Sequence, residues 1–134
     1  MRSPVAYLDS SAIVKLVAFE AETPKLKAYI DQRQRLVSSA LARAETHRAL
    51  WRVAGSRTDR ARTDDVLARI ALVRVDESVL DLAASLPPSE LRTLDAIHLA
   101  TALSFGPDLA ELVTYDLRLA SAALAAGLDV VSPR

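Results

Sequence analysis

The chain has 134 residues, the length of one ordinary domain, and 51% of them are hydrophobic, which is enough for a buried core. Its 17 lysines and arginines balance 17 acidic residues, so overall charge predicts neither nucleic acid nor a membrane as a partner. The sequence contains no cysteine, which excludes disulfides, thiolate metal sites and a cysteine nucleophile and suits a cytoplasmic location.

The first predicted element is a short strand over Val5–Leu8, followed by a helix over about residues 11–18. Because the strand pattern begins by Val5, no charged and then apolar leader precedes it, and no signal peptide is expected. A second helix is predicted to begin at Thr23 and Pro24, with the threonine as N-cap and the proline at the first helical position. The segment RLVSS, at residues 35–39, predicts the second strand.

The longest predicted helix covers about residues 40–54 and ends at Gly55. We expect its buried face to be an apolar stripe at three- and four-residue spacing that consists of Ala40, Ala44, His47, Trp51 and Ala54. On this interpretation His47 is a packed helix residue. A helix over about residues 59–71 and a strand at Leu72–Val75 follow.

The last part of the chain continues the alternation of helices and strands. Asp76 is expected to cap a helix that ends before Pro87, and Thr93 to cap the next helix, which ends at Gly106. A strand, a helix and a last strand complete the chain, at residues 111–116, 117–127 and 129–133. Short strands alternating with helices predict one α/β domain over residues 1–134, with a short central parallel sheet covered by helices on both faces. No apolar run approaches the ~18 residues of a membrane helix, so no membrane partner is expected.

Four acidic residues stand where ligands bind in such folds. Asp9 and Asp116 end predicted strands, and ligands of open parallel sheets bind beyond the carboxyl ends of the strands. Asp95 lies in the first turn of a later helix, and Glu45 lies one turn into the helix over residues 40–54. Taken singly, each has an ordinary explanation. An aspartate at a helix start can cap the helix or be stabilised by the helix dipole, and a glutamate on a helix can simply be exposed to solvent.

Taken together, the four carboxylates suggest a metal site. Carboxylates in one cleft repel one another unless protons or cations intervene. Oxygen ligands without cysteine or paired histidine suit Mg²⁺ or Mn²⁺, which hold phosphates and activate water for phosphodiester hydrolysis. The glycines, Gly55, Gly106 and Gly127, form no phosphate loop, and a nucleophile elbow is absent from the sequence. His98 could orient Asp95 or make a core hydrogen bond, and we favour a structural role for it.

Charge and apolar residues are unevenly distributed along the chain. Residues 33–74 hold ten arginines and four acidic residues, whereas residues 75–134 hold three arginines and nine acidic residues. The basic segment could contact phosphates in a salt-dependent way, or it could form solvated helix faces. An apolar set could line a groove for a partner helix or a second copy, or could pack in the core, and it consists of Ile13, Val14, Leu16, Val17, Phe19, Leu26, Tyr29 and Ile30.

Four segments occur in the order and rough spacing of PIN domains, and they are YLDSSAIVKL, ARAETHRAL, LRTLDAIHLATAL and LVTYDLRLASAALAAGLDVVSP. Over nearly its whole length the chain most resembles the VapC toxins of bacterial type II toxin–antitoxin pairs. The resemblance implies a three-layer α/β/α PIN-like fold and a Mg²⁺- or Mn²⁺-dependent endoribonuclease acting on structured RNA such as tRNA or ribosomal RNA. It also implies a homodimer and a small VapB-type antitoxin that blocks the site.

Matched residue by residue, the resemblance implies an acidic quartet of Asp9, Glu45, Asp95 and Asp116. Ser11 and Thr114 match hydroxyl positions that support the first and fourth acids. Many PIN domains carry a further acid just after the fourth, whereas Leu117 and Arg118 stand there in this chain, which weakens the case for a fully liganded second metal. Arg118 could instead contact phosphate or Asp116.

Two other functions remain open from the sequence. A phosphotransfer domain of the phosphatase or receiver type also places Asp at strand ends. The phosphatase signature needs a second Asp where Ser11 stands, however, and a receiver needs a late lysine, whereas the last lysine is Lys27. A degenerate PIN domain kept as a binding module is the other alternative, and the complete quartet argues against it. The leading prediction is metal-assisted RNA hydrolysis, with the three aspartates as metal ligands, directly or through water, and Glu45 completing the shell or positioning the attacking water.

Overall fold

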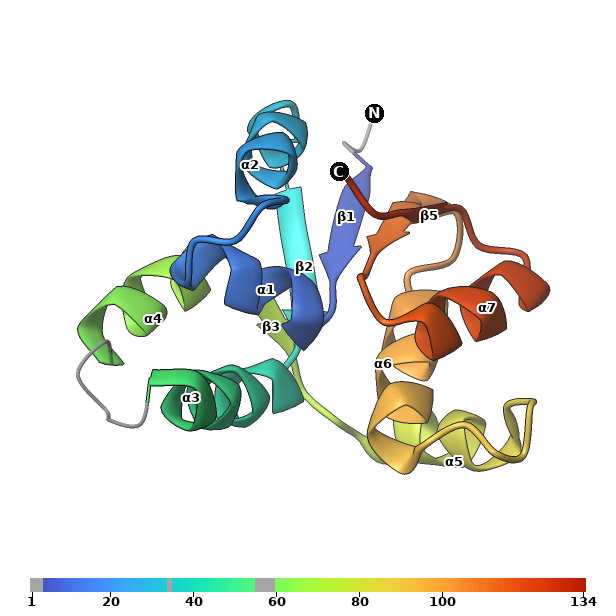
Figure 1. Cartoon of the computed structure of the whole chain (residues 1–134). Coiled ribbons are helices and arrows are strands. Elements are labelled where there is room, and N and C mark those ends of the chain that lie inside the picture. Colours follow the sequence, from blue (N-terminus) through green and yellow to red (C-terminus); the bar gives the residue numbers. More distant parts are fainter. Residues whose placement is uncertain (1–3, 34, 55–59) are drawn as a thin grey trace.

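The computed structural model describes residues 4–33, 35–54 and 60–134, and in these residues a parallel sheet lies between two layers of helices (Figure 1). The strands pair in the order β3-β2-β1-β4-β5, and every pair is parallel. Their bounds are Val5–Leu8 for β1, Arg35–Ser39 for β2, Ala71–Val73 for β3, Leu109–Val113 for β4 and Val130–Val131 for β5. The predicted three-layer α/β/α fold is confirmed.

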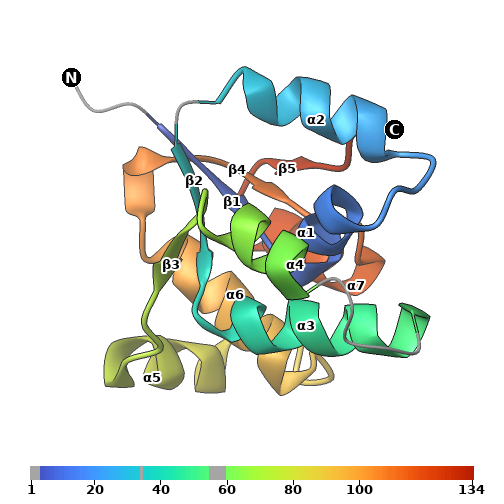
Figure 2. The same ribbon diagram turned by 90° about the vertical axis from the view of Figure 1, so that its left-hand side faces the viewer.

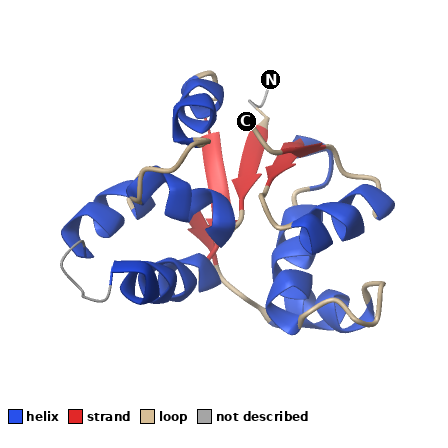
Figure 3. Ribbon diagram, viewed as in Figure 1, coloured by secondary structure: helices blue, strands red, loops and turns tan. Residues whose placement is uncertain are grey.

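The helices form two groups, one on each face of the sheet. The first group consists of α1 (Ser10–Val17), α2 (Thr23–Asp31), α3 (Leu41–Ala54) and α4 (Arg60–Leu67). On the other face lie α6 (Thr93–Leu103) and α7 (Leu117–Ala125), and α5 (Glu77–Ser85) packs on α6. Figure 2 shows α1 and α4 in front of the strands, with α2 above and α3 below in that view, and Figure 3 shows the strands between both groups. None of the helices in the described residues has the length and apolar character that crossing a membrane requires.

Strand β1 lies in the middle of the sheet, and all of its residues are buried. Ala6 and Leu8 pack under α1–α4, whereas Val5 and Tyr7 pack on the side of α6 and α7. Burial on both faces explains the unbroken apolar run of this strand. The strand order reverses between β1 and β4: β2 and β3 lie on one side of β1, and β4 and β5 lie on the other. Ligands of open parallel sheets bind in the crevice at the carboxyl ends of the strands at such a reversal, which here are the ends of β1 and β4.

Several element ends differ from the predicted ones. Strand β4 is shifted towards the N-terminus, so Asp116 does not end the strand but follows it after a short loop. Thr23 and Thr93 are the first residues of α2 and α6 rather than their N-caps. The two helix starts differ because capping residues mark a helix start only to within one or two positions. The predicted end of α3 at Gly55 and start of α4 at Asp59 lie outside the described residues.

The predicted buried face of α3 is wrong. Ala40, just before the helix, and Ala44 are exposed, and Trp51 is 44% exposed. His47 lies at the margin, where its Nε2 is 2.9 Å from Asp64 Oδ1 of α4. Up to Val53, the residues of α3 that are buried in the core are Ala42, Thr46 and Leu50, whereas the side chain of Ala54 is outside the described part of the chain. Alanine and threonine fit buried and exposed positions alike, so the alanines predicted the helix but not which side of it is buried.

The apolar set of residues 13–30 is mostly part of the core. Ile13, Leu16, Val17 and Leu26 are buried, whereas the other members except Phe19 pack at the margin of the same cluster. Phe19 is 75% exposed. The set therefore serves mainly ordinary packing under α1–α4.

Candidate functional site

Asp9 follows directly after β1 and is only 3% exposed. Its Oδ1 accepts a hydrogen bond from the backbone N–H of Ala12 at 3.1 Å, which caps α1, and another from Ser11 Oγ at 2.6 Å. Its Oδ2 accepts from Thr114 Oγ1 at 2.6 Å. A cap of this kind stabilises a helix by ~1 kcal/mol. Capping thus fixes the carboxylate in place at the crevice, so it does not compete with a role in the site.

Ser11 and Thr114 join Asp9 to the loop that follows β4. Ser11 Oγ accepts from the backbone N–H of Tyr115 at 2.9 Å, and Thr114 Oγ1 accepts from the backbone N–H of Asp116 at 3.0 Å. Each hydroxyl therefore donates to the Asp9 carboxylate and accepts from this loop. The pair of hydroxyls sets the position of Asp116 relative to Asp9.

Asp95 and Asp116 face a common hollow at the N-terminal ends of α6 and α7. The hollow has a volume of about 320 Å³ and is lined by Arg92, Asp95, Asp116, Leu117 and Arg118. Asp116 Oδ1 accepts from the backbone N–H of Arg118 at 2.9 Å and so caps α7. Arg92, which was not predicted from the sequence to belong to the site, thus lines the hollow together with Arg118 and the two aspartates. Such a mixture suits a ligand that carries both phosphate and bound cations.

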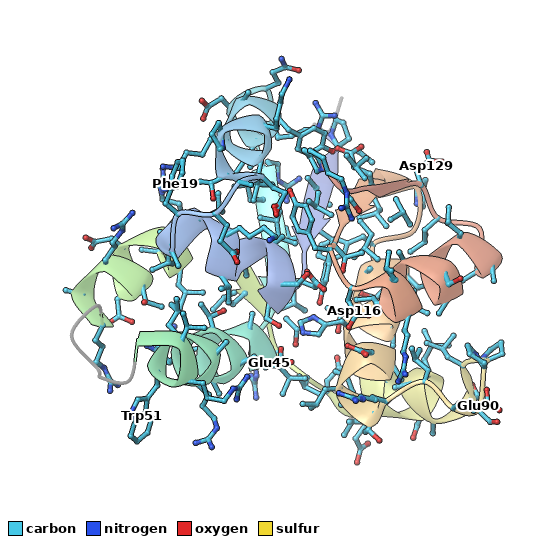
Figure 4. The ribbon with its side chains drawn as sticks, viewed as in Figure 1. Phe19, Glu45, Trp51, Glu90, Asp116 and Asp129 are labelled. Carbon is cyan, nitrogen blue, oxygen red and sulfur yellow. The ribbon has the colours of Figure 1, made fainter. Side chains whose placement is uncertain are left out.

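Glu45 reaches the site from α3, in the opposite helical layer. In Figure 4, Glu45 and Asp116 lie below the carboxyl end of β1. Glu45 Oε1 is 2.5 Å from Nε2 of His98, which is buried on α6 and whose Nδ1 is 2.7 Å from the hydroxyl of Tyr7. His98 therefore contacts Glu45 and not its helix neighbour Asp95. Sequence reasoning missed Tyr7, although a tyrosine hydroxyl inside a buried strand signals a polar partner.

Negative charge is concentrated at the four carboxylates. Burial raises the pKa of Asp9, although the hydroxyls of Ser11 and Thr114 favour its ionised form. Burial also raises the pKa of Asp95, and repulsion from Asp116, Asp9 and Glu45 adds to the rise. Within the described ranges, no lysine or arginine forms an ion pair with any of the four. A bound cation would neutralise this surplus.

The donor set fits a hard divalent cation in its chemistry. All four groups are carboxylates, and Mg²⁺ and Mn²⁺ prefer oxygen ligands. In the part of the chain that the structure describes, no three acidic or histidine side chains are grouped closely enough to hold a metal ion by themselves. Mg²⁺ usually keeps several waters and contacts one or two carboxylates, so this wider spacing suits binding that is partly through water.

Comparisons with known proteins give the family. The family model of the PIN domain matches residues 6–125. Ribonuclease VapC46 of Mycobacterium tuberculosis is 54% identical over 127 residues, which cover 95% of this chain and 96% of that protein. The chain belongs to the VapC ribonucleases of the PIN-domain family. The resemblance stated from the sequence is thereby confirmed.

Solved structures share the fold of this VapC-type ribonuclease. The crystal structure of Mycobacterium tuberculosis VapC20, described as a Sarcin-Ricin loop cleaving toxin, has a TM-score of 0.75 at 20% identity and covers 96% of this chain and 99% of that one. A toxin–antitoxin complex from Klebsiella pneumoniae has a TM-score of 0.71 at 21% identity and covers 96% and 98%. At these identities the likeness concerns the fold.

Proposed function

We propose that this VapC-type ribonuclease is an endoribonuclease toxin that requires Mg²⁺ or Mn²⁺ and hydrolyses phosphodiester bonds of structured RNA. The observation that carries the proposal is that Asp95 lies close enough to the other three carboxylates, which come from separate segments of the chain, to be repelled by each of them. None of them has a lysine or arginine partner among the described residues. The family supports the reaction class.

Asp9, Asp95 and Asp116 would hold the ion, directly or through water, and Glu45 would complete the set. When bound, the ion supplies positive charge that polarises the phosphoryl oxygens and makes water a better nucleophile. The chain contributes the rigid placement of the carboxylates. Ser11 and Thr114 supply that placement for Asp9, because their hydroxyls donate to both of its oxygens.

In the proposed reaction, water attacks phosphorus and the bond between phosphorus and the 3′ oxygen breaks. One water proton ends on that oxygen, so the products carry a 5′-phosphate and a 3′-hydroxyl. Glu45 would help to orient the attacking water, since one of its carboxylate oxygens is already held by His98. Arg118 would bind a phosphate of the RNA at the rim of the hollow that it shares with Asp95 and Asp116.

The proposed substrate is structured RNA, such as tRNA or ribosomal RNA. The description of VapC20 as a toxin that cleaves the Sarcin-Ricin loop supports this class. Exposed arginines supply the positive charge that an RNA backbone needs, and in the basic segment they are Arg35, Arg43, Arg48, Arg52, Arg60, Arg62, Arg69 and Arg74. Binding through them would weaken as salt rises, because cations bound to the RNA are released.

We also propose that the protein acts in the cytoplasm as a homodimer and is inhibited by a VapB-type antitoxin that covers the site. The fold likeness to a toxin–antitoxin complex supports this partner. A neighbouring gene should encode a small protein that co-purifies with this chain and stops its RNA cleavage, and sedimentation should give twice the mass of one chain. Undiminished cleavage with the neighbouring protein bound would contradict the antitoxin proposal.

The test of the reaction is RNA cleavage by the wild-type protein and by Asp9→Asn in Mg²⁺. The wild type should produce ends with 5′-phosphate and should stop in EDTA, and the folded variant should be inactive. Millimolar Mg²⁺ should also raise the Tm of the wild type, because an ion that binds the native state stabilises it. Cleavage by Asp9→Asn at the wild-type rate would refute the assignment, and an unchanged Tm would favour a binding module.

A further inference from the structure

We infer that His98 is a positioning residue of the reaction: it holds the Glu45 carboxylate in the site, and Tyr7 holds His98 in the tautomer that allows this. The inference rests on the proposed function, because Glu45 matters for catalysis only if the quartet does. It adds two residues, neither of them acidic, to those on which the site depends.

Three elements meet in this chain of contacts. The Tyr7 hydroxyl on β1 is 2.7 Å from Nδ1 of His98 on α6, and Nε2 of the same ring is 2.5 Å from Oε1 of Glu45 on α3. The tyrosine and histidine rings pack edge to face, with centroids 5.9 Å apart and planes at 78°. Because α3 and α6 cover opposite faces of the sheet, the contact joins the two helical layers at the carboxyl end of β1.

The partners of His98 determine where its proton lies. A carboxylate can only accept, so Nε2 of His98 must donate to Glu45. In a neutral ring Nδ1 is then an acceptor, and the Tyr7 hydroxyl donates to it. A tyrosine hydroxyl with its ordinary pKa of about 10 is protonated at neutral pH and can therefore donate. His98 is 1% exposed and Tyr7 is fully buried, so water does not compete for the contact between these two residues.

Glu45 needs such a partner more than Asp9 and Asp116 do. Asp9 and Asp116 are fixed by backbone N–H groups at helix starts, whereas Glu45 has a longer side chain that is 21% exposed. Without His98, repulsion from the other acids would drive its carboxylate towards solvent. The bond to His98 uses Oε1, and Oε2 makes no hydrogen bond with a described residue, so it stays available to the ion or to water.

Helix α6 carries both the proposed metal ligand Asp95 and the positioning residue His98. Asp95 and His98 are three positions apart and therefore lie on the same face of the helix. The same helix thus presents one carboxylate itself and fixes a second one across the crevice. Histidine–carboxylate pairs around metal sites commonly change metal affinity or activity by ~10–100-fold when broken.

The test compares His98→Leu, which removes both hydrogen bonds, with His98→Gln, whose amide can still donate to Glu45. We expect His98→Leu to lower kcat and Mn²⁺ affinity, measured by electron paramagnetic resonance, by ~10–100-fold. The Gln variant should recover most of both losses, and Tyr7→Phe should show a smaller loss in the same direction. Equal losses in His98→Leu and His98→Gln, with both variants folded, would overturn the inference.

A double-mutant cycle separates positioning from general damage. In a Glu45→Gln background, His98→Leu should cause little further loss of kcat or Mn²⁺ affinity, and an undiminished loss there would overturn the inference. Ile97→Ala is the matched control, because Ile97 is also buried on α6 but packs on the side of Val79. It should lower the Tm while leaving Mn²⁺ affinity unchanged.

A readout on the wild-type protein covers the case in which the leucine variant does not fold. Nitrogen-15 NMR of the metal-free protein should show His98 protonated at Nε2 and unprotonated at Nδ1, and Glu45→Gln should shift the Nε2 signal. A proton on Nδ1 alone would overturn the inference. These NMR results do not depend on catalysis, so an inactive wild-type protein would count against the proposed function and not against the contact.

Discussion

Thr114 Oγ1 donates a hydrogen bond of 2.6 Å to Asp9 Oδ2, although the two residues are 105 positions apart in the sequence. Thr114 is fully buried and Asp9 is nearly so. The bond joins the carboxyl ends of the two central strands, β1 and β4, at the crevice. The position of the proposed ligand Asp9 therefore depends on a hydroxyl that directly follows a different strand.

Thr114→Val tests this dependence, because it keeps the shape of the side chain and removes the hydroxyl. We expect a loss of ~1–3 kcal/mol in the free energy of unfolding, since a carboxylate oxygen of Asp9 and the N–H of Asp116 lose their partner. RNA cleavage should fall by ~10–100-fold, as is typical for residues that orient metal ligands. Thermal melts and cleavage rates measure the two effects.

Thr46→Val is the matched control for Thr114→Val. Thr46 is also fully buried, but its Oγ1 has no hydrogen-bond partner among the described residues. Replacing this hydroxyl by a methyl group should leave stability unchanged or raise it by ~1 kcal/mol, with cleavage intact. If both variants lost cleavage and stability alike, the role given to the Thr114 hydroxyl would be wrong.

The pH dependence of stability follows from Asp95. Burial and the neighbouring acids raise its pKa, so the folded metal-free protein binds this proton more tightly than the unfolded chain does. The contribution of protonated Asp95 to the free energy of unfolding is thus complete below the ordinary pKa of aspartate, and it is lost as pH rises through the raised pKa of the folded state. In EDTA at pH 7–8, Asp95→Asn should therefore melt a few degrees above the wild type, since roughly 1 kcal/mol shifts the Tm of a domain this size by ~4 °C.

Mg²⁺ should act on the difference in Tm between Asp95→Asn and the wild type in the opposite direction. A bound cation favours ionised carboxylates, so Mg²⁺ should raise the Tm of the wild type more than that of Asp95→Asn. In acid the two proteins should melt together, because Asp95 is then protonated. A variant that melts below the wild type in EDTA at neutral pH would show that Asp95 is not under electrostatic repulsion.

The location of the candidate site is a prediction that the sequence allows, because it follows from strand order. Asp9 and the segment around Asp116 follow buried strands, and parallel strands that end at one edge bring such residues together. The position of Glu45 in the sequence does not show that it lies near the strand ends, because it comes from α3, in the helical layer opposite to α6 and α7. Only the resemblance to PIN domains predicted that Glu45 belongs to the site.

The contacts of individual side chains could not be predicted in the same way. His98 and Asp95 share a helix face, which made Asp95 the natural partner, yet the fold brings Glu45 to His98 from another element. The buried side of α3 was missed for a related reason, since Trp51 is exposed and the small residue Ala42 is buried. Such pairings depend on how elements pack, which local periodicity does not encode.

Arg92 and Arg118 should affect RNA binding and not the chemistry. Both line the hollow that contains Asp95 and Asp116, so alanine at either position should weaken binding of a non-cleaved RNA and reduce the slope of affinity against salt by about one per lost phosphate contact. Lys25→Ala, an exposed position on α2, is the control. Equal salt slopes for all three variants and the wild type would exclude phosphate contacts in the hollow.

Glu111 should matter for stability alone. It is largely buried in β4, where it accepts hydrogen bonds from the Tyr29 hydroxyl and from Nε of Arg33, the latter at 2.6 Å. The Arg33 guanidinium also lies 4.5 Å from the centre of the Tyr29 ring. Glu111→Ala should cost ~1–3 kcal/mol in the free energy of unfolding, because these donors lose their acceptor.

Cleavage by Glu111→Ala, measured well below its Tm, should stay close to that of the wild type. The cluster ties α2 to β4 and contains none of the four proposed ligands. A loss of cleavage as large as that expected for Thr114→Val would mean that the site depends on the whole sheet and not on its local hydrogen bonds.

The most direct test of the central claim is the rate of RNA cleavage by Asp95→Asn as Mg²⁺ is varied. The metal-free variant is expected to be at least as stable as the wild type, so lost activity cannot be attributed to unfolding. We predict a fall of ~100-fold or more at saturating RNA, the scale on which loss of a group that stabilises transition-state charge is felt, with weaker dependence on Mg²⁺. Cleavage at the wild-type rate, with the wild-type Mg²⁺ dependence, would contradict a metal-dependent site built on these four carboxylates.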